Sequence, residues 1–332
     1  MEEESCEIVT KRKKAMADTW STRSSPSFPY VRLQNGARPR PLPNGDVLWR
    51  VLVTVLRGSL LATMALSVAA PGCSAAIAFL GLSERATFVF LVVAAHQIPY
   101  YSLNLFFFLV EWRGYFLRYK LPRTAAHVVD QKLLRQTILE GVVTHWLSQP
   151  LLAYYVLYPT FLSVGASLDV RAPTPSALWA TTQFGAMKIL SAVMMYSIHR
   201  LLHTHLLYAR FHKQHHMYTG AVSVAAEHAS PLEGMLQSLP VILPPLVLQT
   251  HPFVMAVWLF WRCIDNTEMH CGYSFRGSWL HRIGLTHSDA AEYHDHHHTR
   301  NWGSFGDPAL DHIFGTMDAW LVHKRKGRAH EH

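Results

Sequence analysis

Long apolar stretches that carry few charges constrain this chain more than any other feature. Residues 58–82, 87–110, 145–164 and 177–198 are each long enough for a helix to cross a hydrocarbon layer of about 30 Å. Charged residues make up only 16% of the chain, against roughly 25% in soluble domains. Because no water satisfies backbone groups inside lipid, such segments span it as helices. The sequence therefore predicts an all-α, polytopic membrane protein with about four transmembrane helices in residues 47–198.

Clusters of basic residues orient these helices. Residues 1–46 contain the run KRKK, and residues 111–146 contain six lysines and arginines. Because basic segments beside membrane helices stay on the cytoplasmic side, both are expected there, with two spans between them. Residues 1–46 also lack the apolar core of a signal peptide, and we predict a disordered cytoplasmic tail. A basic tail at the other end covers residues 321–332.

The apolar stretch at residues 236–264 carries prolines at positions 240, 244, 245 and 252. Proline interrupts helices because its nitrogen cannot donate a hydrogen bond. We therefore predict a re-entrant helical hairpin, with two helices that are each too short to span the membrane. Such a hairpin returns the chain to the face that it left. The histidines before and after it are then expected on the same cytoplasmic side, in a helical cap.

Histidine is the most unusual component, with 22 residues in the chain. Three clusters stand out, and they read HRLLH from His199, HKQHH from His212 and HDHHH from His294. On a helix, residues three and four positions apart share one face, so each cluster is expected to direct two or three imidazoles toward one point. Imidazole binds iron, zinc and copper, and ligands on facing helices can hold two metal ions. We predict a metal site built from these clusters.

Other features narrow the functional class. The four cysteines form no CxxC pair and are expected to be reduced thiols. The positive charge is spread over two tails and one loop, which argues against nucleic-acid binding, because that calls for a basic patch on one face. The histidine clusters are not low-complexity repeats, which disfavours a zinc-transporter loop. The chain also has no GxGxxG fingerprint, so its electrons are expected from outside.

The stretch from His199 to Thr316 resembles the fatty acid hydroxylase and sterol desaturase superfamily, and within it the sterol C-4 methyl oxidases. HRLLHTHLLYARFHKQHH matches the first two histidine boxes of that family in residue type and spacing. HCGY at residues 270–273 is similar to its HxGY element, HDHHH to its third box, and DHIFGT at residues 311–316 to its closing D-x-x-x-G-T. The resemblance implies a di-iron domain over residues 199–320.

The resemblance also implies a set of iron ligands. After the second box, relatives read E-Y-A-H-P-x-E, whereas this chain reads EHASPLE, with Ser230 at the histidine position and His228 two residues earlier. His228 is therefore a candidate for a relocated ligand. His296 is an alternative in the third box, but the HxxHH spacing favours its neighbours. The candidate ligands are His199, His203, His212, His215, His216, His228, His270, His294, His297 and His298.

Neighbouring positions point to further roles. Asp295 is a candidate to orient a ligand imidazole, because ligating histidines usually donate their second N–H to an oxygen. Arg200 and Lys213 flank ligands, and we expect them to meet lipid headgroups or a redox partner. The segment between His298 and residues 301–303 is shorter than the family resemblance leads us to expect. The part of the site that binds the substrate is therefore expected to differ from that of relatives.

The function implied by the resemblance is that of an oxidoreductase that uses O₂ to oxidise a C–H bond of a lipid, with a 4-methyl sterol as the first substrate hypothesis. A fatty acyl or sphingoid lipid hydroxylase or desaturase is the alternative with the same chemistry. A catalytically inactive metal-binding relative is the alternative of another class. The expected cofactors are two iron ions and O₂, with electrons passed from NAD(P)H by cytochrome b5 and its reductase. The expected location is the endoplasmic reticulum membrane, with the histidine clusters on its cytoplasmic side.

Overall fold

The regular elements of the protein are helices. The computed structural model describes residues 56–58, 70–122, 129–220, 222–282, 286 and 289–329. Within these ranges there is no strand, and one isolated bridge pairs Lys120 with Tyr273. The predicted all-α class is confirmed. The predicted tail at residues 1–46 and residues 59–69 of the first predicted span lie outside the described residues.

The second predicted span corresponds to helix α4, Glu84–Arg113, which follows α3, Ala70–Leu80. Ser83 caps the start of α4, because its hydroxyl accepts the N–H of Ala86 at 3.2 Å. Gly114 ends the helix in a left-handed conformation, as C-terminal glycines commonly do. Within the described part of the chain, α4 is the one helix long and apolar enough to cross a membrane by length and composition.

The third predicted span lies in a continuous helical run, residues 131–163, which we call the proline rod. Two π-helical segments widen it, and each ends one residue before a proline step, Gln149-Pro150 and Tyr158-Pro159. Proline has no N–H to donate, and its ring clashes with the preceding turn of a regular α-helix, so a wider π turn before it accommodates the ring. Its parts are α5 (Gln131–Val143), η4 (Thr144–Ser148), α6 (Gln149–Leu152), η5 (Ala153–Leu157) and α7 (Tyr158–Ser163).

The fourth predicted span lies in α8, Ala177–Leu202, and the predicted hairpin is a pair of helices, α10 (Pro231–Val247) and α11 (Pro252–His270). The break falls at residues 248–251 rather than at the prolines inside α10. Pro245 leaves the carbonyl of Val241 without its usual helical donor. Trp258 of α11 donates its indole N–H to that carbonyl at 2.8 Å, which compensates the lost bond.

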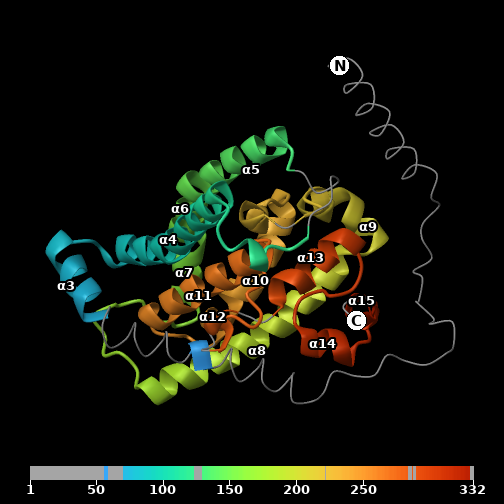
Figure 1. Cartoon of the computed structure of the whole chain (residues 1–332). Coiled ribbons are helices and arrows are strands. Elements are labelled where there is room, and N and C mark those ends of the chain that lie inside the picture. The colour runs from blue at the N-terminus through green and yellow to red at the C-terminus, as the bar shows by residue number, and fades with distance from the viewer. Residues whose placement is uncertain are drawn as a thin grey trace. The chain divides into compact units, whose positions relative to one another are not determined.

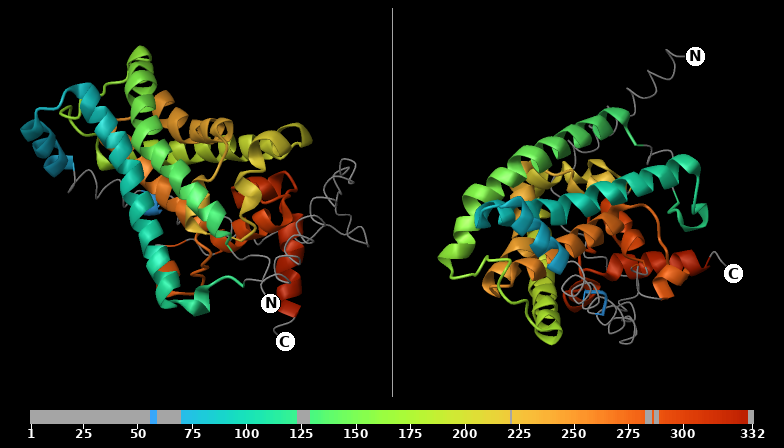
Figure 2. Two further views of the ribbon diagram at one scale, coloured as in Figure 1. Left: turned by 90° about the horizontal axis from the view of Figure 1, so that it is seen from above. Right: turned by 90° about the vertical axis from the view of Figure 1, so that its left-hand side faces the viewer.

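The helices α10 and α11 connect α4 and α8, which lie on opposite sides of the core. α11 packs against α4, and α10 packs against α8. In Figure 1, α11 lies between α4 and α8, and the right-hand view in Figure 2 shows the same order. Large buried side chains fill this core, including Phe88, Phe184, Met255, Trp258 and Trp261.

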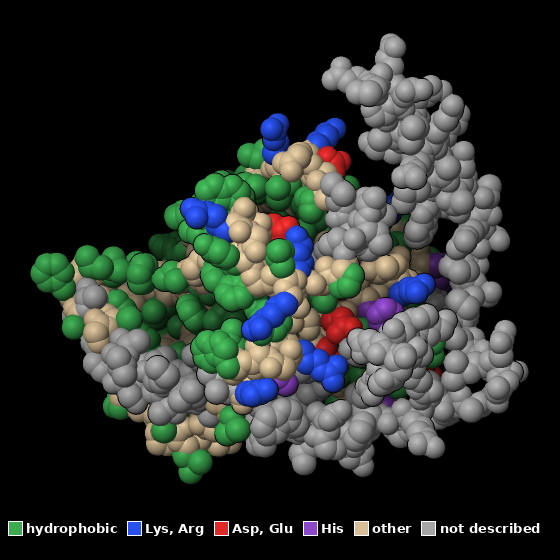
Figure 3. Space-filling view, viewed as in Figure 1, with side chains coloured by type: hydrophobic (Ala, Val, Ile, Leu, Met, Phe, Trp, Pro, Cys, Tyr) green, Lys and Arg blue, Asp and Glu red, His purple; other side chains and the backbone are tan. Residues whose placement is uncertain are grey.

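The histidine-rich part of the chain is built from short elements. The predicted helical cap is helical throughout its regular parts, although several of them are π or 3-10 turns. Figure 3 shows hydrophobic side chains gathered over α3 and α4, and lysine and arginine side chains nearer the top and centre of the view. The remaining elements are η2 (Leu117–Tyr119), α9 (His205–Leu207), η6 (Tyr208–His212), η7 (His215–Met217), η8 (Ser223–Glu227), α12 (Trp279–Arg282), α13 (Ala290–Arg300), α14 (Pro308–Ile313) and α15 (Asp318–Ala329).

Candidate metal centre

Nine of the ten predicted ligands converge into two buried groups of imidazoles. Within each group, one nitrogen from every ring lies within 4.8 Å of one from each of the others. The first group has five members and the second has four. The first group is His199, His203, His212, His216 and His297, and the second group is His215, His270, His294 and His298.

The histidine clusters of the sequence do not correspond one-to-one to these groups. HRLLH sits at the end of α8 and serves the first group alone. HKQHH lies on η6 and η7 rather than on an α-helix, and it gives two histidines to the first group and His215 to the second. HDHHH lies on α13 and gives His297 to the first group and two histidines to the second. Two adjacent groups therefore share the elements that build them.

The rings are held with one nitrogen inward and the other outward. In six of the nine, Nδ1 contacts an oxygen outside the groups at 2.6–3.3 Å. Five of these oxygens belong to main-chain carbonyls and one belongs to a carboxyl group. The pairs are His199 with Phe305 O, His212 with Glu233 Oε1, His215 with His228 O, His270 with Asn266 O, His297 with Gly303 O, and His298 with Tyr218 O.

This arrangement leaves nitrogen lone pairs facing one another. Nε2 of His199 lies 3.2 Å from Nε2 of His212, and His199 carries its proton on Nδ1, because that atom faces the Phe305 carbonyl, which can only accept. Nε2 of His215 and Nε2 of His270 face each other in the same way, 3.5 Å apart. With no proton between them these lone pairs repel, whereas a cation between them would be bound by both. The donor set therefore fits a metal ion in each group.

Burial favours the neutral, ligating form of the rings. Burial lowers the pKa of His199 and of His270 to about 4. Burial, with repulsion from neighbouring imidazoles, lowers the pKa well below its ordinary value in His203, His215, His216, His294, His297 and His298. At neutral pH these nitrogens are therefore available as ligands.

Glu233 is the one acidic side chain among the outward acceptors. It is fully buried, and its Oε1 lies 2.6 Å from Nδ1 of His212. Burial raises the pKa of Glu233 to about 9, and a cation bound by His212 would oppose this shift and favour the carboxylate. Ser230 is the N-cap of α10, and its hydroxyl accepts the N–H of Glu233 at 3.3 Å. At the position where the family resemblance led us to expect a histidine, Ser230 thus caps the helix turn that presents Glu233.

His228 is the predicted ligand that the structure does not bring into either group. Its Nδ1 lies 3.1 Å from the Thr137 hydroxyl and 3.2 Å from a Glu140 oxygen, on the side of the proline rod. Its main-chain carbonyl, instead, accepts a hydrogen bond from Nδ1 of His215 at 3.3 Å. The backbone of His228 serves the second group, and its imidazole faces away because it caps a 3-10 turn with extended backbone.

Other flanking residues take places of their own. His296 is buried outside both groups, with its ring near Trp320. Asp295 is not among the six acceptors found for the ligand rings. Arg200 is exposed and donates to the Tyr196 hydroxyl at 3.0 Å, and Lys213 is exposed. The expectation that these two meet headgroups or a redox partner stays a prediction.

Sequence reasoning missed a third polar cluster. Glu227 of η8 lies 2.8 Å from Nε2 of His96 on α4 and 2.6 Å from Nε2 of His145 on the proline rod, and Cys263 lies beside them. Burial opposes ionisation of Glu227, but the two imidazoles outweigh it and lower the pKa of its carboxyl. His96 and His145 both lie in long apolar stretches of the sequence, and this could have indicated the cluster, because ionisable residues in such stretches usually have polar partners.

Comparisons with known proteins agree with this geometry. A family model described as fatty acid hydroxylase matches residues 184–316. A Dictyostelium discoideum protein provisionally named a methylsterol monooxygenase is 30% identical over 224 residues, 67% of this chain and 81% of the relative. Human fatty acid hydroxylase domain-containing protein 2 is 29% identical over 244 residues, 70% of this chain and 68% of the relative. Arabidopsis thaliana methylsterol monooxygenase 2-2 is 26% identical over 227 residues, 67% of this chain and 82% of the relative.

No solved structure matches the chain. The family model covers the region from α8 to the turn after α14, and this region holds all nine converging histidines. The matched relatives extend further, over about two thirds of the chain. The chain belongs to the fatty acid hydroxylase family of oxidoreductases, in which it is similar to methylsterol monooxygenases.

Proposed function

We propose that this protein is a membrane di-iron monooxygenase that oxidises a C–H bond of a lipid, with a 4-methyl sterol as its substrate. The observation that carries the proposal is the pair of imidazole groups whose Nε2 lone pairs face one another while Nδ1 is tied outward. Substrate identity rests on relatives from Dictyostelium, Arabidopsis and Aspergillus that are named methylsterol monooxygenases.

The nine converging histidines would hold the two ions, and His228 would act through its carbonyl alone. Imidazole suits iron, zinc and copper alike, and of these we propose iron because O₂ chemistry needs a redox-active metal. When bound, the irons would supply O₂ activation, which no side chain of the chain can supply. Electrons are proposed to come from NAD(P)H through cytochrome b5 and its reductase, which approach the exposed basic side chains of the histidine-rich face.

The protein's own groups orient the ligand rings and exclude bulk water from the centre. The outward hydrogen bonds fix the tautomer and the orientation of six rings, as such bonds do around bound metals. All nine rings are buried, so bulk water is kept from the reacting centre. Glu233 lies where its carboxyl group can share a proton with Nδ1 of His212, because Oε1 and Nδ1 are 2.6 Å apart.

Exposed apolar side chains support a membrane location. They are frequent on α4 and on the proline rod, where lipid would cover them. Both ends of the α10–α11 pair lie at the histidine groups, since Glu233 contacts His212 and His270 belongs to the second group. This supports a re-entrant hairpin that returns to one face. The four-span topology and the cytoplasmic side of the endoplasmic reticulum are proposed with it. Examples of the exposed side chains are Phe90, Ile98, Leu105, Phe108, Leu139, Trp146 and Tyr155.

The second candidate is oxidation of a fatty acyl or sphingoid lipid by the same centre. The human relative, which is named for a fatty acid hydroxylase domain, favours it. A catalytically inactive metal-binding relative is the third candidate, and Ser230 in place of the family's histidine is the feature that favours it.

Lipid analysis of cells that lack the protein tests the substrate. Accumulated 4-methyl sterols that disappear when the wild-type chain is restored, but not when His215→Ala is restored, support the proposal. Unchanged sterols with altered hydroxylated sphingolipids or fatty acids favour the second candidate. Purified protein that holds about two irons per chain and consumes O₂ excludes the third, whereas less than about one metal per chain contradicts the first two.

A further inference from the structure

The loop at residues 301–306, after α13, brings two main-chain carbonyls to the first histidine group. Gly303 O accepts from Nδ1 of His297, and Phe305 O accepts from Nδ1 of His199, each at 2.6 Å. These two histidines come from different helices, α13 and α8. One short loop therefore sets the ring orientation of two of the five histidines in that group.

This loop has a backbone conformation that side chains disfavour. The φ angles are 58° at Asn301, 72° at Gly303 and 55° at Ser304, all in the left-handed region. A residue with a side chain gives up about 1–2 kcal/mol there. The loop belongs to no helix or strand, so contacts from outside it must hold its shape.

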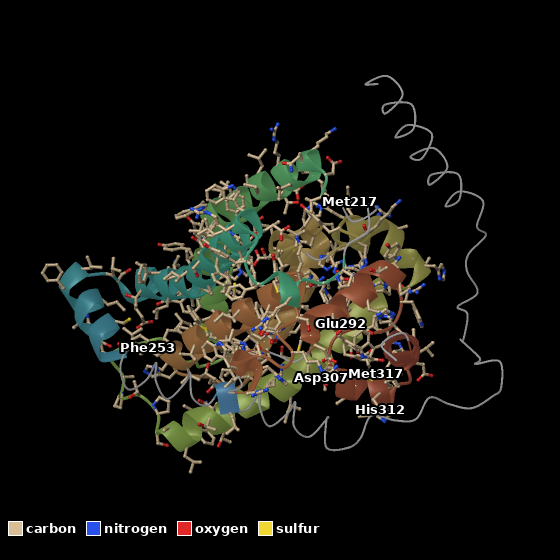
Figure 4. All side chains as sticks on the ribbon, in the orientation of Figure 1. Met217, Phe253, Glu292, Asp307, His312 and Met317 are labelled. Carbon is tan, nitrogen blue, oxygen red and sulfur yellow. The ribbon has the colours of Figure 1, made fainter. Side chains whose placement is uncertain are left out.

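Asp311 and Thr316 make those contacts. Asp311 of α14 is fully buried, and its Oδ1 and Oδ2 accept the N–H groups of Phe305 and Gly306 at 3.0 and 3.2 Å. The Thr316 hydroxyl donates to Asp311 Oδ1 at 2.6 Å, and the Thr316 carbonyl accepts the N–H of Ser304 at 3.1 Å. Asp307, His312 and Met317, which are labelled in Figure 4, mark the course of the chain around α14.

We propose that Asp311, supported by Thr316, is a positioning residue for the metal in the first histidine group, an inference that rests on the proposed function. Asp311 holds the loop so that its two carbonyls keep the protons of His199 and His297 on Nδ1. Their Nε2 lone pairs then point inward, where a metal needs them. The buried aspartate and the threonine of the D-x-x-x-G-T segment thus act at a distance from the metal, through two peptide carbonyls.

The effect is confined to one group. In the second group, the outward Nδ1 atoms are held by the carbonyls of His228, Asn266 and Tyr218. None of these lies in the loop that Asp311 holds. Loss of Asp311 is therefore expected to weaken one metal site and leave the other unchanged, which a general loss of packing would not do.

The test uses Asp311→Asn in the full-length chain in detergent, stripped of metal and titrated anaerobically with Co²⁺ alone. The new amide places an N–H₂ group against a main-chain N–H that the carboxylate accepted. Visible absorption and equilibrium dialysis count the ions and their affinities. We expect two tightly held ions in the wild type, and in the variant one ion unchanged and one bound about 10- to 100-fold more weakly.

The matched control is Asp307→Asn, four residues earlier. Asp307 caps α14 by accepting the N–H of Ala309 at 2.9 Å, a role that asparagine fills equally well. Two unchanged sites in Asp311→Asn, or two sites weakened equally, overturn the inference. If Asp311→Asn fails to fold, Thr316→Val replaces it, with Thr316→Ser as the variant that restores the hydroxyl. Weaker Co²⁺ binding at one site in Thr316→Val, with recovery in Thr316→Ser, supports the inference. Two unchanged Co²⁺ sites in Thr316→Val overturn it. A wild type that binds no Co²⁺ instead contradicts the proposed function.

Discussion

Gly303→Ala gives a prediction whose size follows from two separate features of one residue. Gly303 has a φ of 72°, a conformation that costs a residue with a Cβ about 1–2 kcal/mol. A Cβ on Gly303 would also lie 2.4 Å from the carbonyl oxygen of Thr316, so that carbonyl must move. The same carbonyl accepts the N–H of Ser304, a residue that is 1% exposed.

Losing that bond leaves a buried donor unpaired, at a cost of about 1–3 kcal/mol. The sum of the two effects is about 2–5 kcal/mol of unfolding free energy. Gly315→Ala is the matched control, because Gly315 has a φ of 69° and a Cβ added to it would meet no atom within 4 Å. It should cost the backbone part alone, about 1–2 kcal/mol.

The assay is the melting temperature of both variants in detergent, followed by circular dichroism. At about 2 °C per kcal/mol for a chain of this size, Gly303→Ala should melt roughly 2–6 °C below Gly315→Ala. Equal melting temperatures would refute the reasoning, because they would show that the Thr316 carbonyl yields without loss. An unchanged Gly303→Ala would also refute the left-handed backbone at this position.

Three further predictions concern other contacts. Glu233→Gln should weaken Co²⁺ binding to the first histidine group by about 10- to 100-fold without affecting the second, as seen by titration, because an amide accepts the imidazole proton less strongly than a carboxylate does. His215→Ala should lower the metal content of the purified chain, whereas His228→Ala should retain it, and equal losses would contradict the assignment of His228 to a backbone role. Trp258→Phe should destabilise the chain by about 1–3 kcal/mol in a thermal melt, because the carbonyl of Val241 loses its donor, and no change would show that another group satisfies it.

The class of fold and most of the candidate site could be predicted from the sequence. Periodicity and hydropathy are local properties, so they located α4 and α8 closely. The three histidine boxes supplied eight of the histidines that converge, and the resemblance of HCGY to the HxGY element supplied His270. The division into two groups could not be predicted. His215 and His216 are adjacent in sequence yet belong to different groups, because η7 is a 3-10 turn and not the α-helix that the spacing suggested.

The position of His228 outside both groups has a different origin. A sequence pattern shows which residue stands at a position but not whether its side chain or its main chain faces the site. Here the carbonyl of His228 orients His215, and its ring bonds to Thr137 on the proline rod. Likewise, the prolines of α10 predicted a break, but Trp258 donates to the carbonyl that Pro245 leaves free. Such contacts join residues far apart in the chain, and no local pattern encodes them.

The position of α13 along the chain has a consequence for biosynthesis. Every helix proposed to enter the membrane precedes it, and both histidine groups include rings that it carries. During translation, the earlier helices can therefore insert and pack before either group is complete. On the proposed function, iron could be captured in full only after residues 294–298 have left the ribosome, and the first group would gain its final support only when Thr316 follows. Metal loading of the proposed centre would thus be a late event in maturation, and a cell short of iron would be expected to accumulate inserted chains without metal.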